Sequence, residues 1–166
     1  MDMTTLMAWI SHWEGRKNKT YIDSMGHPTV GVGFNLDANG AQAAIEALGL
    51  DYDQVRAGTQ TLTDAQIDAL LEQTVNRAVD DAHTPIPGFD NVPGDKQIVI
   101  VDMIFNLGLA GFSKFAQTIK AINRQDWLTA SQQMQQSAWF HQVGRRAQAD
   151  VDMMAGRITP ADILGG

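Results

Sequence analysis

The chain has 166 residues, enough for one domain or two small lobes, and its formal net charge is −7. It contains no cysteine, which excludes disulfides and thiolate metal sites. The acidic balance argues against a broad nucleic-acid footprint, and no apolar run approaches the roughly 20 residues of a membrane span. We therefore expect neither nucleic-acid binding nor membrane insertion.

The first predicted element is a helix near the N-terminus. Its apolar face carries Met3, Leu6, Met7 and Ile10 at helical spacing. Thr4 or Thr5 is the expected cap, and Gly15 is expected to end the helix. This prediction places Glu14 in the last turn, close to the next element.

Residues 19–36 change to strand character. β-Branched and aromatic residues flank a Ser-Met-Gly-His-Pro turn, which predicts a small hairpin or a three-stranded sheet. Asp23 lies just before this turn and Thr29 just after it. Gly31 and Gly33 alternate with valines, and glycines in a strand often allow a ligand or a neighbouring helix to approach the backbone.

The remainder of the chain is predicted to be helical. A short helix is expected over 41–48, then a polar connection over 51–60, and a capping box at Thr63 opens a long helix to about Ala82. The later helices are expected at 98–107, with a stop at Gly108, and near 115–122, 126–136, 145–154 and 160–164.

A long helix between a β-containing segment and an all-helical remainder suits a connector between two lobes. We therefore predict an α+β fold with an N-terminal lobe over 1–62, a connecting helix over 63–82 and a helical C-terminal lobe over 83–166.

The candidate chemistry lies in the spacing of Glu14, Asp23 and Thr29. Eight residues separate the two acids, and five separate Asp23 from the threonine. Two acids and a hydroxyl on different elements can face one another across a cleft, which suits glycosidic bond hydrolysis. Both an inverting and a retaining course remain open. The histidines lack metal-ligand spacing, so we expect no metal and no other cofactor.

Further motifs extend this pattern through most of the chain. They are Glu14-Gly15, Tyr21-Ile22-Asp23, Gly26, Thr29-Val30-Gly31-Val32-Gly33, Met103-Ile104-Phe105-Asn106-Leu107-Gly108, Gly111-Phe112, Trp127, Ser137-Ala138-Trp139-Phe140 and Arg146-Ala147. In this order they resemble the phage-type lysozymes, glycoside hydrolase family 24. Residues 37–61 match poorly.

The resemblance implies a two-lobe, monomeric muramidase that acts on the glycan strand of peptidoglycan. Such enzymes cut the β-1,4 bond between N-acetylmuramic acid and N-acetylglucosamine. Glu14 would be the general acid that protonates the leaving oxygen. Asp23 would support positive charge on the sugar ring and help to hold the attacking water, which the Thr29 hydroxyl would position.

Residues of the helical lobe are implied to contact the substrate or the acid. Arg146 corresponds to a basic residue that lies near the acid in the family. Asn106 and Asp102 are candidate contacts to sugar amides and hydroxyls. Trp139 and Phe140 are interpreted as core residues rather than stacking platforms for sugars, and Phe112 and Trp127 are likewise assigned mostly to the core.

Two departures from the family pattern stand out. Phe34 occupies a position where many relatives carry histidine, so we expect apolar packing in place of a histidine–carboxylate link. The net charge of −7 lacks the general attraction to an anionic wall that basic relatives have.

The N-terminus has no Lys or Arg before Arg16, so it is not typical of a secretory signal. We expect synthesis in a host cytoplasm and action on the periplasmic wall after holin-dependent release. A phage endolysin, a tail lysozyme and a bacterial effector remain possible contexts.

Two alternative functions remain. A lytic transglycosylase would close a 1,6-anhydro ring instead of using water, but retention of Asp23 and Thr29 argues against it. A wall-binding module without turnover would not need all three candidate catalytic residues.

Overall fold

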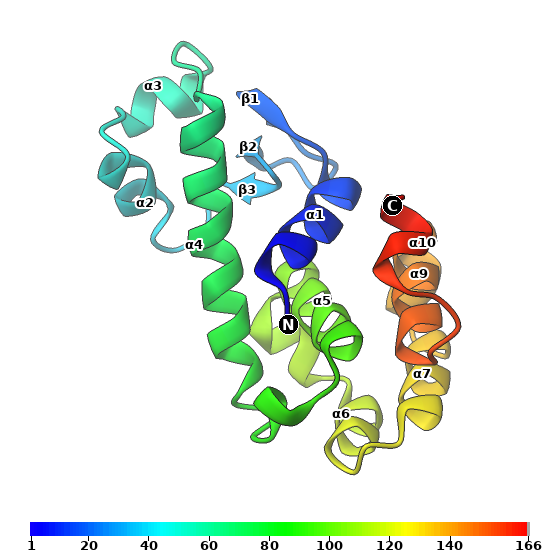
Figure 1. Ribbon diagram of the computed structural model, residues 1–166. Helices are drawn as coiled ribbons and strands as arrows, with labels where there is room; N and C mark the ends of the chain where they lie inside the picture. Colours follow the sequence, from blue (N-terminus) through cyan, green and yellow to red (C-terminus); the bar gives the residue numbers. More distant parts are fainter. Residues whose placement is uncertain (166) are drawn as a thin grey trace. The chain divides into compact units, whose positions relative to one another are not determined.

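The computed structural model describes residues 1–165, which form a small antiparallel sheet and a series of helices (Figure 1). This confirms the predicted α+β fold class. The strands are β1 (Lys17–Ile22), β2 (Pro28–Gly31) and β3 (Phe34–Asn35), paired in that order. The helical elements are α1 (Met3–Glu14), α2 (Ala41–Ala47), α3 (Tyr52–Ala57), α4 (Asp64–Ala82), η1 (Phe89–Asn91), α5 (Gly94–Ser113), α6 (Ala116–Asn123), α7 (Trp127–Gln135), α8 (Ala138–Val143), α9 (Arg145–Met154) and α10 (Pro160–Leu164).

Helix α1 ends where the sequence predicts, but its cap differs. Asp2, not a threonine, caps it: Oδ1 accepts from the Thr4 amide at 3.0 Å, and Oδ2 accepts from the Thr5 hydroxyl at 2.7 Å. The cap prediction is wrong because an acid directly ahead of the helix satisfies its first donors. Gly15 adopts a φ of 75°, which ends the helix and leaves Glu14 as its last residue.

The polar connection predicted over 51–60 is also wrong, because this segment contains helix α3. The Asp51 side chain accepts from the Gln54 amide at 3.0 Å, and Gly58 closes the helix at a φ of 76°. Val55 is fully buried. A capping residue and a terminal glycine thus define a short helix within a polar segment.

The long helix α4 begins at the predicted capping box. The Thr63 hydroxyl accepts from the Gln66 amide at 3.2 Å, and the Gln66 side chain accepts from the Thr63 amide at 2.9 Å. The two residues satisfy each other's backbone donors, and the helix runs to Ala82 as expected.

Helix α5 is interrupted where the sequence predicts a stop. Gly108 has a φ of 74° and a ψ of 163°, which are not helical angles. By length and composition α5 could cross a membrane, but 56% of its most apolar window is buried inside the protein, which is typical of a core helix. Helix α8 follows a Ser137 cap in a segment for which the sequence predicts no helix.

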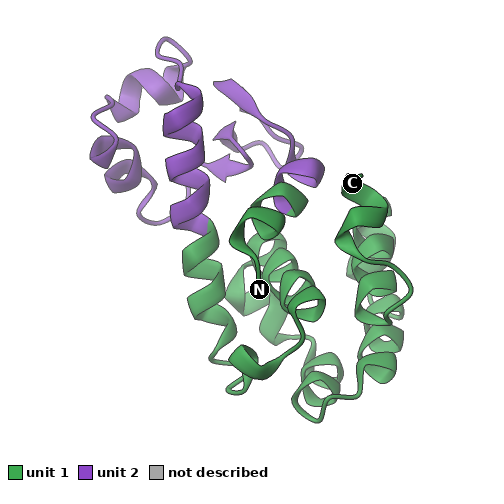
Figure 2. Cartoon of the chain, in the orientation of Figure 1, with its two compact units in different colours: residues 1–9, 75–166 green, residues 10–74 purple. Residues whose placement is uncertain are grey.

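The chain divides into two compact units, coloured separately in Figure 2. Unit 1 contains residues 1–9 and the chain from Val75 onward; unit 2 contains residues 10–74. The largest fully buried side chains of unit 1 are Leu6, Trp9, Ile86, Phe89, Ile100, Met103 and Phe112. In unit 2 they are Ile10, Leu36, Ile45, Ile67 and Leu70. Each unit therefore has an apolar core of its own.

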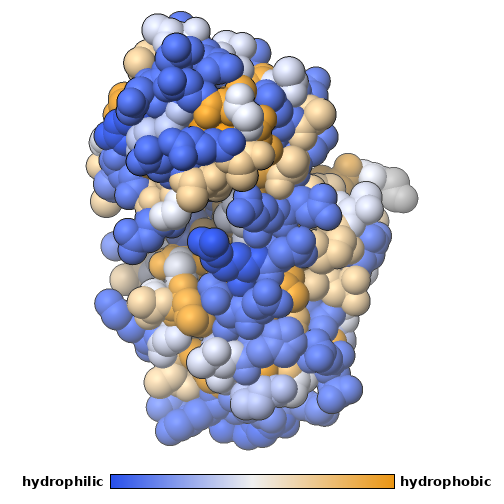
Figure 3. Space-filling view, turned by 90° about the vertical axis from the view of Figure 1, so that its left-hand side faces the viewer, coloured by the Kyte–Doolittle hydropathy of each residue, from blue (hydrophilic) through white to orange (hydrophobic). Residues whose placement is uncertain are grey.

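On the face drawn in Figure 3, hydrophilic residues dominate and hydrophobic ones are scattered among them. Within the described residues, the exposed large hydrophobic side chains are Met1, Ile22, Met25 and Leu128. Ile22 and Met25 flank Asp23 in the turn between β1 and β2, so exposed apolar residues lie beside a candidate catalytic residue there.

Candidate active site

Glu14 lies against the turn between β2 and β3. Gly33 in this turn has a φ of 61°, and a Cβ atom there would come within 2.5 Å of Glu14 Oε2 and 2.9 Å of its Cδ. A side chain at this position would therefore force the Glu14 carboxylate to shift. At Gly31 a Cβ would meet the side chain of Ile67 from α4 at 3.5 Å. Side chains from two helices therefore approach the two glycines, in agreement with the sequence prediction.

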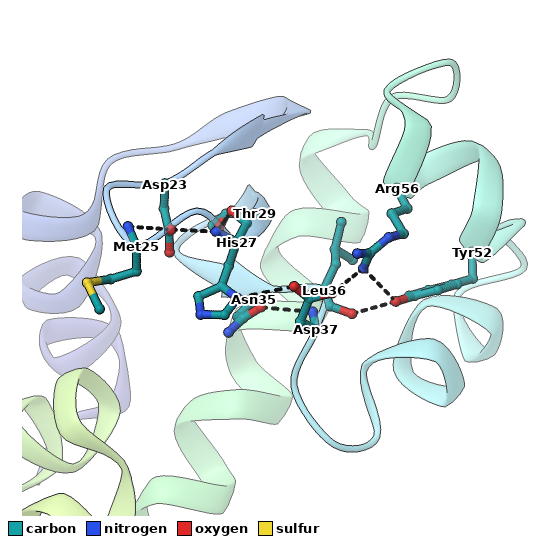
Figure 4. A network of polar contacts seen from close by, with 9 residues as sticks. All are labelled: Asp23, Met25, His27, Thr29, Asn35, Leu36, Asp37, Tyr52 and Arg56. Carbon is teal, nitrogen blue, oxygen red and sulfur yellow. Dashed lines mark hydrogen bonds and ion pairs between the residues drawn. The ribbon is translucent and has the colours of Figure 1, made fainter.

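Asp23 is held at the start of the turn between β1 and β2 (Figure 4). Its Oδ1 accepts hydrogen bonds from the amides of Met25 and His27, both at 2.9 Å. Its own amide donates to the His27 carbonyl at 2.9 Å. The hydrogen bond from the His27 amide is the main cause that lowers the pKa of Asp23, so this group stays a carboxylate under mildly acidic conditions.

Thr29 occupies the central strand, β2. It pairs with Tyr21 of β1 and Asn35 of β3, and it is 3% exposed. Its hydroxyl donates to the His27 carbonyl at 3.0 Å, which leaves the oxygen lone pairs as acceptors. The His27 carbonyl also accepts from the Asp23 amide at 2.9 Å, so Asp23 and Thr29 are held to the same backbone group.

Tyr21 is a neighbour of this site to which the sequence assigns no role. Burial raises the pKa of its phenol, and the negative charges of Glu14 and Asp23 raise it further. Both acids therefore act on one phenol. A signal for this position exists in the sequence, because residues two apart in a strand share a face and Tyr21 precedes Asp23 by two.

Arg146 and Asp102 form a buried ion pair within unit 1. Arg146 Nε donates to Asp102 Oδ2 at 2.9 Å and Nη2 donates to Oδ1 at 2.7 Å, with side-chain exposures of 8% and 0%. The structure thus gives Asp102 a guanidinium partner and no exposed surface. This surrounding favours a role in orienting Arg146 over the predicted contact to a sugar.

Asp150 completes this cluster, and the sequence analysis does not identify it. It is fully buried, and Trp9 Nε1 donates to its Oδ1 at 3.2 Å. Burial raises the pKa of Asp150 well above its ordinary value, and the charge of Asp102 raises it further. The position follows Arg146 by four residues, about one helical turn, which is the sequence signal for a shared face.

Asn106 is exposed on α5, and its Oδ1 accepts from Trp139 Nε1 at 3.0 Å. Trp139 is 5% exposed and Phe112 is fully buried, in agreement with their interpretation as core residues, whereas Phe140 and Trp127 are half-buried. Trp139 also lines an open pocket of about 370 Å³ in unit 1, together with Phe115.

Within residues 1–165, no group of three or more His, Asp or Glu side chains is placed to hold a metal ion. The candidate site consists of its carboxylates, its hydroxyl and the backbone groups that hold them.

An α+β fold that matches a lysozyme family model defines a glycoside hydrolase of the lysozyme type. The chain belongs to the phage lysozyme family, whose model matches residues 11–152. Peptidoglycan is the substrate that this family implies.

The relatives agree with this assignment at low identity. Over 153 residues the chain is 22% identical to "Probable T4-type lysozyme 1" of Dictyostelium discoideum, covering 87% of this chain and 90% of that protein. It is 24% identical over 155 residues to "Pre-baseplate central spike protein Gp5" of Enterobacteria phage T4, covering 87% of this chain and 27% of that protein.

Proposed function

We propose that the enzyme is a muramidase that cleaves the β-1,4 bond between N-acetylmuramic acid and N-acetylglucosamine. Glu14 acts as the general acid, and Asp23 and Thr29 hold and position the attacking water. The close approach of the Glu14 carboxylate to Gly33 carries this proposal, because it holds the helix-borne acid against the sheet that bears Thr29 and whose β1–β2 turn bears Asp23.

The chemistry follows from the protonation and hydrogen bonding of these groups. Glu14 transfers its proton to the leaving oxygen as the glycosidic bond breaks. The water bonds to the anomeric carbon and releases a proton to solvent, from which Glu14 is reprotonated. Asp23, whose pKa is lowered, remains a carboxylate and stabilises the positive charge that develops on the sugar ring. The Thr29 oxygen accepts a hydrogen bond from the water, since its own proton is donated to the His27 carbonyl.

Two residues of unit 1 are proposed to bind the glycan strand. The exposed amide of Asn106 is suited to hydrogen-bond sugar amides or hydroxyls. Arg146, oriented by its bidentate pairing with Asp102, is proposed to contribute positive charge beside the bound glycan strand. Action on the periplasmic wall after holin-dependent release belongs to the same proposal.

The test of the mechanism is release of reducing ends from purified peptidoglycan by wild type and by Glu14→Gln. Removing a general acid costs roughly 10²- to 10⁴-fold in rate, so we expect a loss of that size with an unchanged melting temperature. Equal activity in the two proteins would overturn the mechanism. Mass spectrometry of the products separates hydrolysis from transglycosylation, because anhydro-muropeptides would identify the latter.

A further inference from the structure

His27 contacts both Asp23 and Thr29 through its backbone. Its amide donates to Asp23 Oδ1 at 2.9 Å, and its carbonyl accepts from the Thr29 hydroxyl at 3.0 Å. A displacement of the His27 backbone therefore displaces the side chains of Asp23 and Thr29, which are proposed to position the attacking water.

The ring of His27 is held from outside the turn (Figure 4). Its Nδ1 lies 3.1 Å from Asp37 Oδ2, just beyond the end of β3. Asp37 is itself paired with Arg56 of α3 through Oδ1. The hydrogen bonds from His27 and Arg56 lower the pKa of Asp37, so its carboxylate is available to both partners.

Helix α3 anchors the outer end of this chain of contacts. Arg56 Nη1 lies 3.2 Å from the Tyr52 hydroxyl, and that hydroxyl donates to the Leu36 carbonyl at 2.5 Å. The backbone also returns to the sheet, because the Leu36 amide donates to the Pro28 carbonyl at 2.9 Å. All these residues belong to unit 2.

We propose that His27 is a positioning residue, which the Asp37–Arg56 pair clamps so that its backbone holds Asp23 and Thr29 in place for the attacking water. The catalytic part of this inference rests on the proposed function. The contact between His27 and Asp37 concerns the structure of the turn alone, and the pKa of Asp23 measures its effect separately.

The test compares two replacements of His27 in the intact chain. His27→Asn retains a side-chain N–H donor close to the position of Nδ1, whereas His27→Phe keeps a ring and removes the donor. A misplacement of about 1 Å can cost about 100-fold, so we expect His27→Phe to lower kcat about 10- to 100-fold with KM nearly unchanged. His27→Asn should remain within about threefold of wild type by the same argument.

Matched variants locate the effect. Asp37→Ala should reproduce His27→Phe, and the double variant should lose no more than either single one, because both remove the same contact. Arg56→Met leaves the turn sequence intact and should lower kcat in the same direction, which keeps the clamp testable if a turn variant fails to fold. His83→Phe breaks another histidine–carboxylate pair, with Asp90 at 2.8 Å, and should leave kcat unchanged.

The independent readout is the pKa of Asp23, followed by carboxyl-carbon NMR. Loosening the turn weakens the hydrogen bond from the His27 amide, so His27→Phe should raise this pKa toward its ordinary value. Wild-type kcat and an unmoved Asp23 pKa in His27→Phe would overturn the inference, as would equal losses in His27→Asn and His27→Phe. Activity of Glu14→Gln would instead overturn the proposed function, while the pKa measurement would still decide the clamp.

Discussion

Individual residues of the site act by leaving room for a neighbour or by orienting charge through a backbone amide. Gly33 has no side chain where Glu14 needs space, and the His27 amide contacts the Asp23 carboxylate. Tyr21 adds a phenol that both acids influence. These contacts use ordinary residue types. Each contact depends on where the backbone places the residues that make it.

Gly33→Ala tests the space beside Glu14. The added Cβ would approach Oε2 to 2.5 Å, and alanine is disfavoured at a φ of 61°. We expect Glu14 to be displaced, with kcat reduced at least about 10-fold and stability lowered by about 1–3 kcal/mol. Peptidoglycan turnover and urea unfolding measure the two effects. Gly49→Ala, also at positive φ but with open space around it and outside the Asp23 turn, is the control for strain alone.

Helices α5 and α9 are joined by the buried cluster of Asp102, Arg146 and Asp150. Two carboxylates facing one guanidinium in a buried site would leave a net negative charge, which is costly away from water. Burial first, and the charge of Asp102 second, raise the pKa of Asp150, so the protonated form of Asp150 is favoured.

This cluster predicts a pH-dependent stability. The pKa of Asp150 in the folded protein lies above its value in the unfolded chain. The contribution of Asp150 to stability is therefore full below the unfolded pKa and is lost as the pH rises through the folded pKa. Between these two values the free energy of unfolding should fall by up to about 1.4 kcal/mol per pH unit. Asp150→Asn mimics the protonated form and should remove this component. Urea unfolding of both proteins across a pH series checks it, and parallel curves would contradict the assignment.

The helices also show what sequence patterns capture. Gly15 and Gly108 interrupt helices as predicted, because positive φ values favour glycine locally. The bounds of α9 and α10 agree with those expected, since a strong apolar pattern or a Pro start defines them. Helix α3 escapes prediction because its one buried residue, Val55, gives no periodic pattern over so short a segment.

For the protein as a whole, the formal net charge of −7 sets the long-range interaction with substrate. An acidic enzyme gains no general attraction to an anionic wall, so binding must come from short-range contacts. Dissolved salt screens repulsion as well as attraction, and the response of activity to salt therefore reports the sign of the long-range term.

Raising ionic strength from about 0.01 M to 0.15 M shortens the screening length from about 30 Å to 8 Å. We expect kcat/KM on purified peptidoglycan to stay constant or rise over this range. Combining Glu72→Lys with Asp80→Lys replaces two exposed negative charges by positive ones and should make the salt response less positive. A steep fall in wild-type activity with salt would contradict the expectation.

Local patterns in the chain were enough to predict the fold class and the family, and the spacing of Glu14, Asp23 and Thr29 was enough to select them as catalytic candidates. Periodicity, glycine positions and ordered motifs can be read without any tertiary contact. The folded arrangement decided which groups those residues meet. The approach of Glu14 to Gly33, the contact of Asp37 with His27 and the burial of Asp150 beside Asp102 each bring together residues that are separated in sequence. The energies of such contacts depend on distance and burial, which no spacing in the chain specifies.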